Sequence, residues 1–412
     1  MAKMPHIKFL DKRSPPTVFT LTAIAGLGAL SMNIFLPSLP AMTAYFNADY
    51  GLMQLSVALY LGVTAFLQII VGQISDRYGR RPVLLVAMSI FTIASVGCLF
   101  APTAEIFLFF RMMQAIVAAG LVLSRAAIRD MVEPSEAASM IAYVTMGMSL
   151  IPMIGPALGG FLDEIFGWKA NFWALILLGG LTVWLIYRDM GETAPLSKRS
   201  FKDQIRQYPE LLRSPRFWGY AAAGMFASGT FFSYLGGAPF VGDEIYHLSS
   251  SALGIFFGAP AVGYLIGNFI VGRFGARLGL DRMILTGAIV ATIGPFISLV
   301  LHMSGIANPY SFFIFMTFVG FGNGMVLPNA NAGVLSVRPS LAGSAAGLAS
   351  ALMFGGGALL SGKAGAMLSI ESGAIPLLLM MTICSTLSII AILLVMWRAR
   401  KTGPLEDVIT DH

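Results

Sequence analysis

A short charged segment lies between two long apolar stretches of this 412-residue chain. It runs from Gly72 to Arg81 and reads Gly-Gln-Ile-Ser-Asp-Arg-Tyr-Gly-Arg-Arg. Its glycines, Gly72 and Gly79, permit close helix approach and a tight turn. Its carboxylate can bind an arginine or a helix N-terminus, and its guanidinium groups can pair with carboxylates. The charged residues are Asp76, Arg77, Arg80 and Arg81. The pattern predicts an ion-paired turn between two helices, with a merely basic loop as the alternative.

A second polar pair lies inside an apolar stretch. Arg111 is six residues into the stretch from Ile106 to Ala127, and Gln114 follows one helical turn later on the same face. An arginine inside a membrane is costly and usually faces a cavity or a partner. The alternative is that its side chain reaches out to the nearer membrane surface.

The acidic residues, unlike Arg111, lie outside the middle of the apolar stretches. None of the 20 acidic residues falls in the middle of a predicted span, although a buried carboxylate is the usual proton carrier of a membrane pump. Asn33, which closes the first span, has an amide that cannot carry a proton. Any proton coupling must therefore use a carboxylate near the end of a span. The available residues are Asp76, Asp130, Asp163 and Asp243.

The elements that position these residues are membrane helices. The chain is 57% hydrophobic and 11% charged, whereas soluble proteins average about a quarter charged residues. The apolar runs are continuous and about 20 residues long, which favours helices over alternating barrel strands. We predict twelve spans: 17–36, 52–71, 82–100, 106–127, 137–162, 172–187, 217–241, 252–271, 283–301, 310–331, 341–360 and 375–397.

The basic residues set the orientation. Apart from Arg111, Lys169 and Lys363, every Lys and Arg falls on one side if both termini are cytoplasmic. The longest hydrophilic stretch divides the chain into an N-terminal bundle (1–188), a cytoplasmic linker (189–216) and a C-terminal bundle (217–412). The positive charge is explained by this anchoring, and we expect no nucleic-acid binding. The scattered histidines and the two cysteines, both within spans, predict neither a metal site nor a disulfide.

The Gly72–Arg81 segment resembles the signature loop of the major facilitator superfamily, and a partial copy follows at Val271, Gly272, Arg277 and Gly279. The resemblance implies twelve helices in two pseudo-symmetric six-helix bundles. It also implies that the segment is a gate, which we call the gate segment, whose aspartate bonds to the eleventh helix and to an arginine ending the fourth. The corresponding partners here are Arg125, Arg129 and Asp130. Ala276 replaces the aspartate in the second copy.

Two further motifs resemble those of one branch of this superfamily. Arg111 and Gln114 match a fourth-helix motif whose arginine is implicated in proton transfer or substrate binding. The fifth span resembles the antiporter motif that seals the central cavity, with simple helix packing as the alternative. Its residues are Gly147, Gly155, Pro156, Gly159 and Gly160. Two further segments, Asn33 to Pro37 and Ser124 to Asp130, also carry the resemblance. Together with the fourth-span arginine, they make the chain similar to the bicyclomycin/chloramphenicol resistance (Bcr/CflA) family of drug:proton antiporters.

From this resemblance we expect a monomeric transporter of the bacterial inner membrane, with no enzymatic activity and no cofactor apart from the proton as coupling ion. It would export drug-like small molecules by alternating access. The alternative is a facilitator or symporter of one small metabolite, which Asn33 favours. Plausible polar contacts for a substrate are Asn33, Tyr60, Arg111, Gln114, Tyr234, Asn268 and Asn323.

Overall fold

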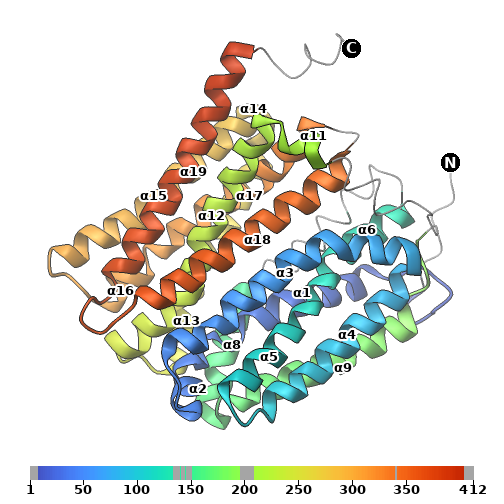
Figure 1. The fold of residues 1–412 in the computed structure, drawn as a ribbon, viewed down its shortest axis with the longest axis horizontal. Coiled ribbons are helices and arrows are strands. Elements are labelled where there is room, and N and C mark those ends of the chain that lie inside the picture. The colour runs from blue at the N-terminus through green and yellow to red at the C-terminus, as the bar shows by residue number, and fades with distance from the viewer. Residues whose placement is uncertain are drawn as a thin grey trace. The chain divides into compact units, whose positions relative to one another are not determined.

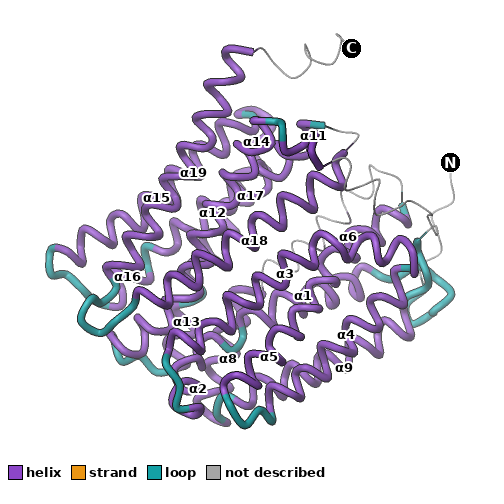
Figure 2. Tube along the Cα trace, in the orientation of Figure 1, coloured by secondary structure: helices purple, strands orange, loops and turns teal. Residues whose placement is uncertain are grey.

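The computed structural model describes residues 8–132, 140, 144, 151–194, 208–338 and 341–402. Within these ranges every regular element is a helix (Figure 2). Ten helical segments there are long and apolar enough to cross a membrane. The other two predicted spans overlap α8 (Ile151–Phe166) and α12 (Pro215–Phe240). The all-α membrane fold is therefore confirmed, and the described helices are consistent with twelve spans.

The chain forms two compact units. The first comprises Met1–Arg199 with His247–Gly258, and the second comprises Ser200–Tyr246 with Ala259–His412. The short helix α13 (Ser250–Phe256) thus belongs to the first unit, although it follows α12 in the sequence. It packs on α8 of the same unit.

The first unit is a bundle in which α4 packs against both α9 and α5, while α3 packs on α6 (Figure 1). Its described helices other than α8 and α13 are α1 (Val18–Asn33), η1 (Leu36–Ser38), α2 (Leu39–Phe46), α3 (Tyr50–Tyr78), α4 (Arg80–Leu99), α5 (Ala104–Gln114), η2 (Ala115–Val117), α6 (Ala118–Met131) and α9 (Lys169–Asp189).

The second unit is a bundle in which α12 packs against α18, α19 and α17, and α17 also packs against α14 and α15. Its other described helices are α11 (Tyr208–Leu212), η3 (Val241–Ile245), α14 (Ala259–Leu278), α15 (Leu280–Met303), α16 (Pro309–Phe313), α17 (Met316–Val337), α18 (Ala342–Met367) and α19 (Ile375–Thr402).

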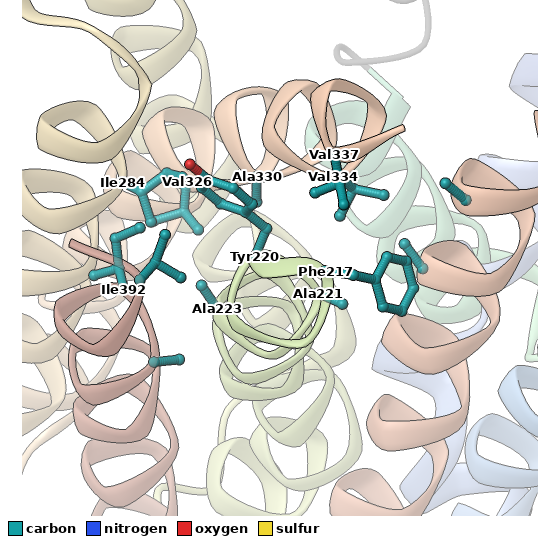
Figure 3. Packing of buried hydrophobic residues seen from close by; sticks show 14 of the residues in the cluster. Phe217, Tyr220, Ala221, Ala223, Ile284, Val326, Ala330, Val334, Val337 and Ile392 are labelled. Atoms are coloured by element: carbon teal, nitrogen blue, oxygen red, sulfur yellow. The ribbon is translucent and has the colours of Figure 1, made fainter. Parts of the chain in front are cut away.

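Small and aliphatic side chains form the core of the second unit. In Figure 3, Tyr220 of α12 lies beside Ile284 of α15 and Val326 of α17, while Phe217 points to the other side of α12, and all four are buried. Membrane helices gain little from the hydrophobic effect, so they rely on close van der Waals packing, which small residues allow. This packing fixes the rotation of α12 and therefore which of its side chains face inward.

The first and fourth spans are among those that differ from the prediction. The first was expected to end at Leu36, but the chain stays helical through η1 and α2 to Phe46. Pro37 does not break the chain there because it lies in the first turn of η1, where its missing N–H has no helical partner to lose. The fourth span is interrupted by the 3₁₀ turn η2, directly after Gln114. Such turns tighten a helix locally and so change the faces presented before and after it.

Candidate functional site

The gate segment is built around a sharp break between α3 and α4. Gly79 alone separates the two helices, with φ +95° and ψ 153°. A residue with a Cβ rarely adopts a positive φ, so glycine is required for this turn. Gly279 separates α14 from α15 in the second unit with φ +78°. The two copies found in the sequence therefore share the same backbone turn.

Arg80 is the centre of the ion-pair network at this turn. Its guanidinium lies 2.5 Å from the Asp76 carboxylate of α3 and 3.0 Å from the Asp130 carboxylate of α6. It also donates hydrogen bonds to the Ser75 hydroxyl and, at 3.3 Å, to the Gly72 carbonyl. The planar guanidinium has five donors in a fixed fork and can bind several oxygens at once, whereas a lysine ammonium is a compact point charge without that fork. One largely buried side chain therefore joins α3, α4 and α6.

The other predicted gate residues are more exposed than Arg80. The Asp76 side chain is 46% exposed, and Arg77, Arg125 and Arg129 are exposed as well. Arg81 donates to the Tyr187 carbonyl at 3.0 Å and lies over the ring of the same residue. The structure thus brings Asp76, Arg80 and Asp130 together.

The close helix approach expected at Gly72 is not seen among the described residues of the first unit. A Cβ added to Gly72 would meet no atom within 4 Å, and the same holds for its counterpart Gly272. Gly72 instead contributes its backbone carbonyl, which accepts from Arg80. Any residue has such a carbonyl, so the structure does not require glycine at this position.

Sequence reasoning missed Glu192, which lies just after α9 in the predicted linker. Its Oε1 accepts the backbone N–H of Arg80 at 2.7 Å, and its Oε2 accepts that of Arg81 at 3.3 Å. It therefore caps the N-terminus of α4, whose first turn has no acidic residue of its own. The partners are 112 and 111 residues apart, so no local pattern could reveal the contact.

Arg111 is fully buried in the first unit, which excludes the alternative that it reaches the membrane surface. Its guanidinium donates to the Ser31 carbonyl at 2.9 Å, the Ser31 hydroxyl at 3.2 Å and the Gln114 Oε1 at 2.7 Å. The rings of Phe35 and Tyr60 lie 4.4 and 4.2 Å from its Cζ, a cation–π arrangement on two aromatic rings. Gln114 is held in turn by its N–H bond to Ser95 at 2.7 Å.

The charge of Arg111 has no anionic counterpart among the partners that the structure describes. All its hydrogen-bond acceptors are neutral, and its Nε, also buried, makes no hydrogen bond there. A buried cation is costly without a carboxylate, and neutral dipoles and ring faces offset only part of that cost. Such positions in membrane helices are commonly functional.

Glycines of the antiporter-type motif lie where two neighbouring backbones approach α8. A Cβ on Gly159 would overlap the Ile34 carbonyl after α1, and one on Gly160 would overlap the Ser250 carbonyl of α13. Gly254 of α13 is equally close to the Pro156 carbonyl. Gly155 faces the Leu30 side chain at 3.2 Å, and Gly147 lies outside the described residues. These glycines therefore allow α8 to pack tightly on both sides.

The remaining substrate-contact candidates lie in both units. Asn33 donates to the Ala29 carbonyl at 2.8 Å, while its buried Oδ1 makes no hydrogen bond in the described structure. In the second unit Tyr234 packs on Phe312 and Phe313, and Asn268 donates to the Tyr264 carbonyl at 2.8 Å. Asn323 is buried with its Oδ1 likewise unbonded in the described ranges. Of all the candidates, Tyr60, Arg111 and Gln114 form one cluster.

Comparison with known proteins decides the family. The profile of the Major Facilitator Superfamily matches residues 21–362 and 236–408. The chain belongs to the major facilitator superfamily. It is therefore a multi-pass membrane transporter and not an enzyme.

Three curated relatives extend over most of the chain. An uncharacterised MFS-type transporter, YdgK of Bacillus subtilis, is 33% identical over 80% of this chain and 83% of its own. Multidrug resistance protein D of Escherichia coli is 27% identical over 85% and 89%. A bicyclomycin resistance protein homolog of Haemophilus influenzae is 25% identical over 91% and 94%. These names are consistent with the Bcr/CflA branch.

Solved structures agree on the fold of this superfamily member. The crystal structure of a D-xylose-proton symporter matches with a TM-score of 0.71 and 16% sequence identity. The match covers 92% of this chain and 97% of the symporter. At that identity the similarity establishes the fold alone.

Proposed function

We propose that this transporter exports drug-like, amphipathic small molecules from bacteria across the inner membrane in exchange for protons, by alternating access. The observation that carries the proposal is the Arg80 network, in which one arginine joins three helices through contacts that can break and re-form. Drug export is supported by the names of the relatives, two of which refer to drug resistance. The proposal further includes both termini in the cytoplasm, as the basic residues predict, and a monomer.

Proton coupling is assigned to the gate carboxylates. Asp76 and Asp130 share Arg80, and protonation of either one removes a negative partner from the guanidinium. Asp76 is half exposed and can exchange protons with water, whereas the Asp130 side chain is only 15% exposed. A proton on Asp76 would therefore weaken the contact between α3 and α4 and favour the switch.

Arg111 is proposed to line the path of substrate or proton within the first unit. Its positive charge is stabilised by neutral acceptors and two aromatic faces. An anionic substrate group would supply the missing counter-charge, and a neutral hydrogen-bond acceptor could bind the unbonded Nε. Gly155 to Gly160 would close the cavity during the switch, as the antiporter-type motif implies.

A second candidate function is a facilitator or symporter for one small metabolite. Asn33 favours it, because its amide cannot carry a proton and its buried oxygen is free to accept a hydrogen bond from a ligand. In this case transport would follow the substrate gradient, and the gate carboxylates would act only in the conformational switch.

Flux in proteoliposomes separates the two candidates. Purified protein is reconstituted, an inward proton gradient is imposed, and uptake or release of bicyclomycin, chloramphenicol and an amphipathic cation is followed. Antiport predicts that flux stops when the gradient is collapsed with an ionophore. Unchanged flux after collapse would contradict proton coupling and favour the facilitator.

A further inference from the structure

Two carboxylates, one at the last residue of α9 and one three residues beyond it, cap the N-termini of two different membrane helices. Asp189 is fully buried at the start of α1, and Glu192 lies at the start of α4. Neither helix has an acidic residue in its own first turn. The positive ends of both helix dipoles are therefore compensated by one four-residue stretch.

Asp189 fixes the position of this stretch. It accepts four hydrogen bonds, from the N–H of Leu10 at 2.6 Å, the N–H and hydroxyl of Thr17 at 3.1 and 2.8 Å, and the hydroxyl of Thr20 at 2.6 Å. Gly191 then donates to the Ser14 carbonyl at 2.9 Å, and a Cβ on Gly191 would lie 2.7 Å from that oxygen. The backbone that carries Glu192 is thus held firmly against the start of α1.

Glu192 in turn covers the gate turn. Its carboxylate lies directly over the face of Gly79 where a Cβ would project, and it accepts the first two N–H groups of α4. Arg80 is the first residue of α4, and its side chain forms the ion pairs with Asp76 and Asp130. The direction in which that side chain leaves the turn depends on where the helix begins, so the cap sets the geometry of the network.

The second unit differs at the equivalent turn, where the acidic residue is local. Its equivalent turn at Gly279 is followed by Asp281, which lies in the first turn of α15 itself. Asp281 accepts a hydrogen bond from the Tyr220 hydroxyl at 2.8 Å. A local acid would have been enough to stabilise α4 alone. The distant Glu192 additionally joins the gate turn to the end of α9.

We propose that Glu192 is a positioning residue of the gate: its carboxylate holds the Gly79 turn so that Arg80 reaches both Asp76 and Asp130, and it couples that turn to the chain segment leaving α9. This inference rests on the proposed gate function of the segment. It assigns a role to a residue outside the gate motif. It also gives a second reason, besides the φ angle, why Gly79 must lack a side chain: a Cβ there would overlap the Glu192 carboxylate.

The test uses the full-length protein and two readouts. The first is hydrogen exchange of the backbone amides of Arg80 and Arg81, which Glu192 binds directly. The second is turnover and apparent affinity for bicyclomycin and chloramphenicol in proteoliposomes. The variants are Glu192→Ala, which removes the cap, and Glu192→Gln, which keeps an accepting oxygen but not the charge.

Thr103→Ala is the matched control. Thr103 caps α5 in the same unit by accepting the Ile106 N–H, and it is not part of the gate network. Loss of an N-cap costs a helix about fivefold in its folding equilibrium, so both alanine variants should be destabilised to a similar degree. A difference in turnover between the two alanine variants then reflects the loss of gate positioning and not the loss of helix stability.

For Glu192→Ala we expect faster exchange at Arg80 and Arg81, with turnover reduced about fivefold and apparent substrate affinity unchanged. Glu192→Gln should recover most of the turnover, and Thr103→Ala should keep all of it. Unchanged exchange in Glu192→Ala would overturn the inference, as would an equal loss of turnover in Thr103→Ala. If Asp76→Asn transports normally, the gate function itself fails, whereas normal transport by Glu192→Ala alone refutes only the role of Glu192.

Discussion

Replacing Arg80 by alanine should give a folded, membrane-inserted protein whose gate contacts are lost. Arg80 holds Asp76 and Asp130 and donates to the Gly72 carbonyl. The pair with the half-exposed Asp76 contributes roughly 0.5 kcal/mol, as exposed ion pairs do. The pair with the less exposed Asp130 contributes about 1.5 kcal/mol, because removing the arginine leaves that carboxylate without its cation.

The hydrogen bond to Gly72 adds about 1 kcal/mol. The total is about 3 kcal/mol, which corresponds to a shift of roughly 100-fold in the equilibrium between the state described here and one in which the contacts are broken. A transporter that must visit both states slows when one of them becomes rare. We therefore expect turnover to fall at least about tenfold in Arg80→Ala.

The assay is gradient-driven flux of bicyclomycin or chloramphenicol in proteoliposomes, with the thermal unfolding of the detergent-purified protein measured in parallel. Arg80→Lys is the control. Lysine keeps the charge but lacks the fixed fork of five donors, so the turnover of Arg80→Lys should lie between those of the native protein and Arg80→Ala. Full turnover in Arg80→Ala would refute the gate function of the network. A lysine variant as slow as the alanine variant would show that geometry matters and charge does not.

Four further substitutions test positions in the first unit. Arg111→Met should abolish transport while leaving the melting temperature equal or higher, since an apolar side chain removes the cost of an unpaired buried charge; a large drop in melting temperature with transport intact would contradict this. Gly159→Ala should destabilise the protein by about 1–3 kcal/mol, because its Cβ would overlap the Ile34 carbonyl. Gly180→Ala in α9, where a Cβ would meet nothing within 4 Å, should be neutral or slightly stabilising in the same thermal unfolding assay. Asp189→Ala should cost roughly 3 kcal/mol or more, because four donors lose their acceptor; normal thermal stability would show that water replaces the carboxylate.

The helices and the turn at Gly79 could be predicted from the sequence because their causes are local. A run of apolar residues of membrane length must be helical, since lipid offers no partner for backbone N–H and C=O groups. A glycine between charged residues at the end of such a run indicates a turn. The burial of the pair Arg111 and Gln114 followed partly from their spacing on one helical face.

The identity of the central gate residue could not be predicted in this way. Asp76 and Arg80 lie four residues apart on either side of a helix break, so neither residue alone suggests that Arg80 would be the one buried. Asp130 and Glu192 approach it through tertiary contacts, 50 and 112 residues away in the chain. The two aromatic rings on Arg111 come from other helices, and one of them, Phe35, lies in an interrupted helix that was expected to end there.

The assignment of α13 to the first unit has a consequence for how the protein is made. Gly160 of α8 approaches Ser250, and the oxygen of Pro156 approaches Gly254, so this surface of α8 is completed only by residues 247–258. During synthesis the first unit therefore cannot finish packing until α12 has already emerged from the ribosome. A fragment ending at Arg199 would lack this covering segment. A separately expressed N-terminal half would therefore depend on residues 247–258, which lie in the second half of the sequence, to complete its packing.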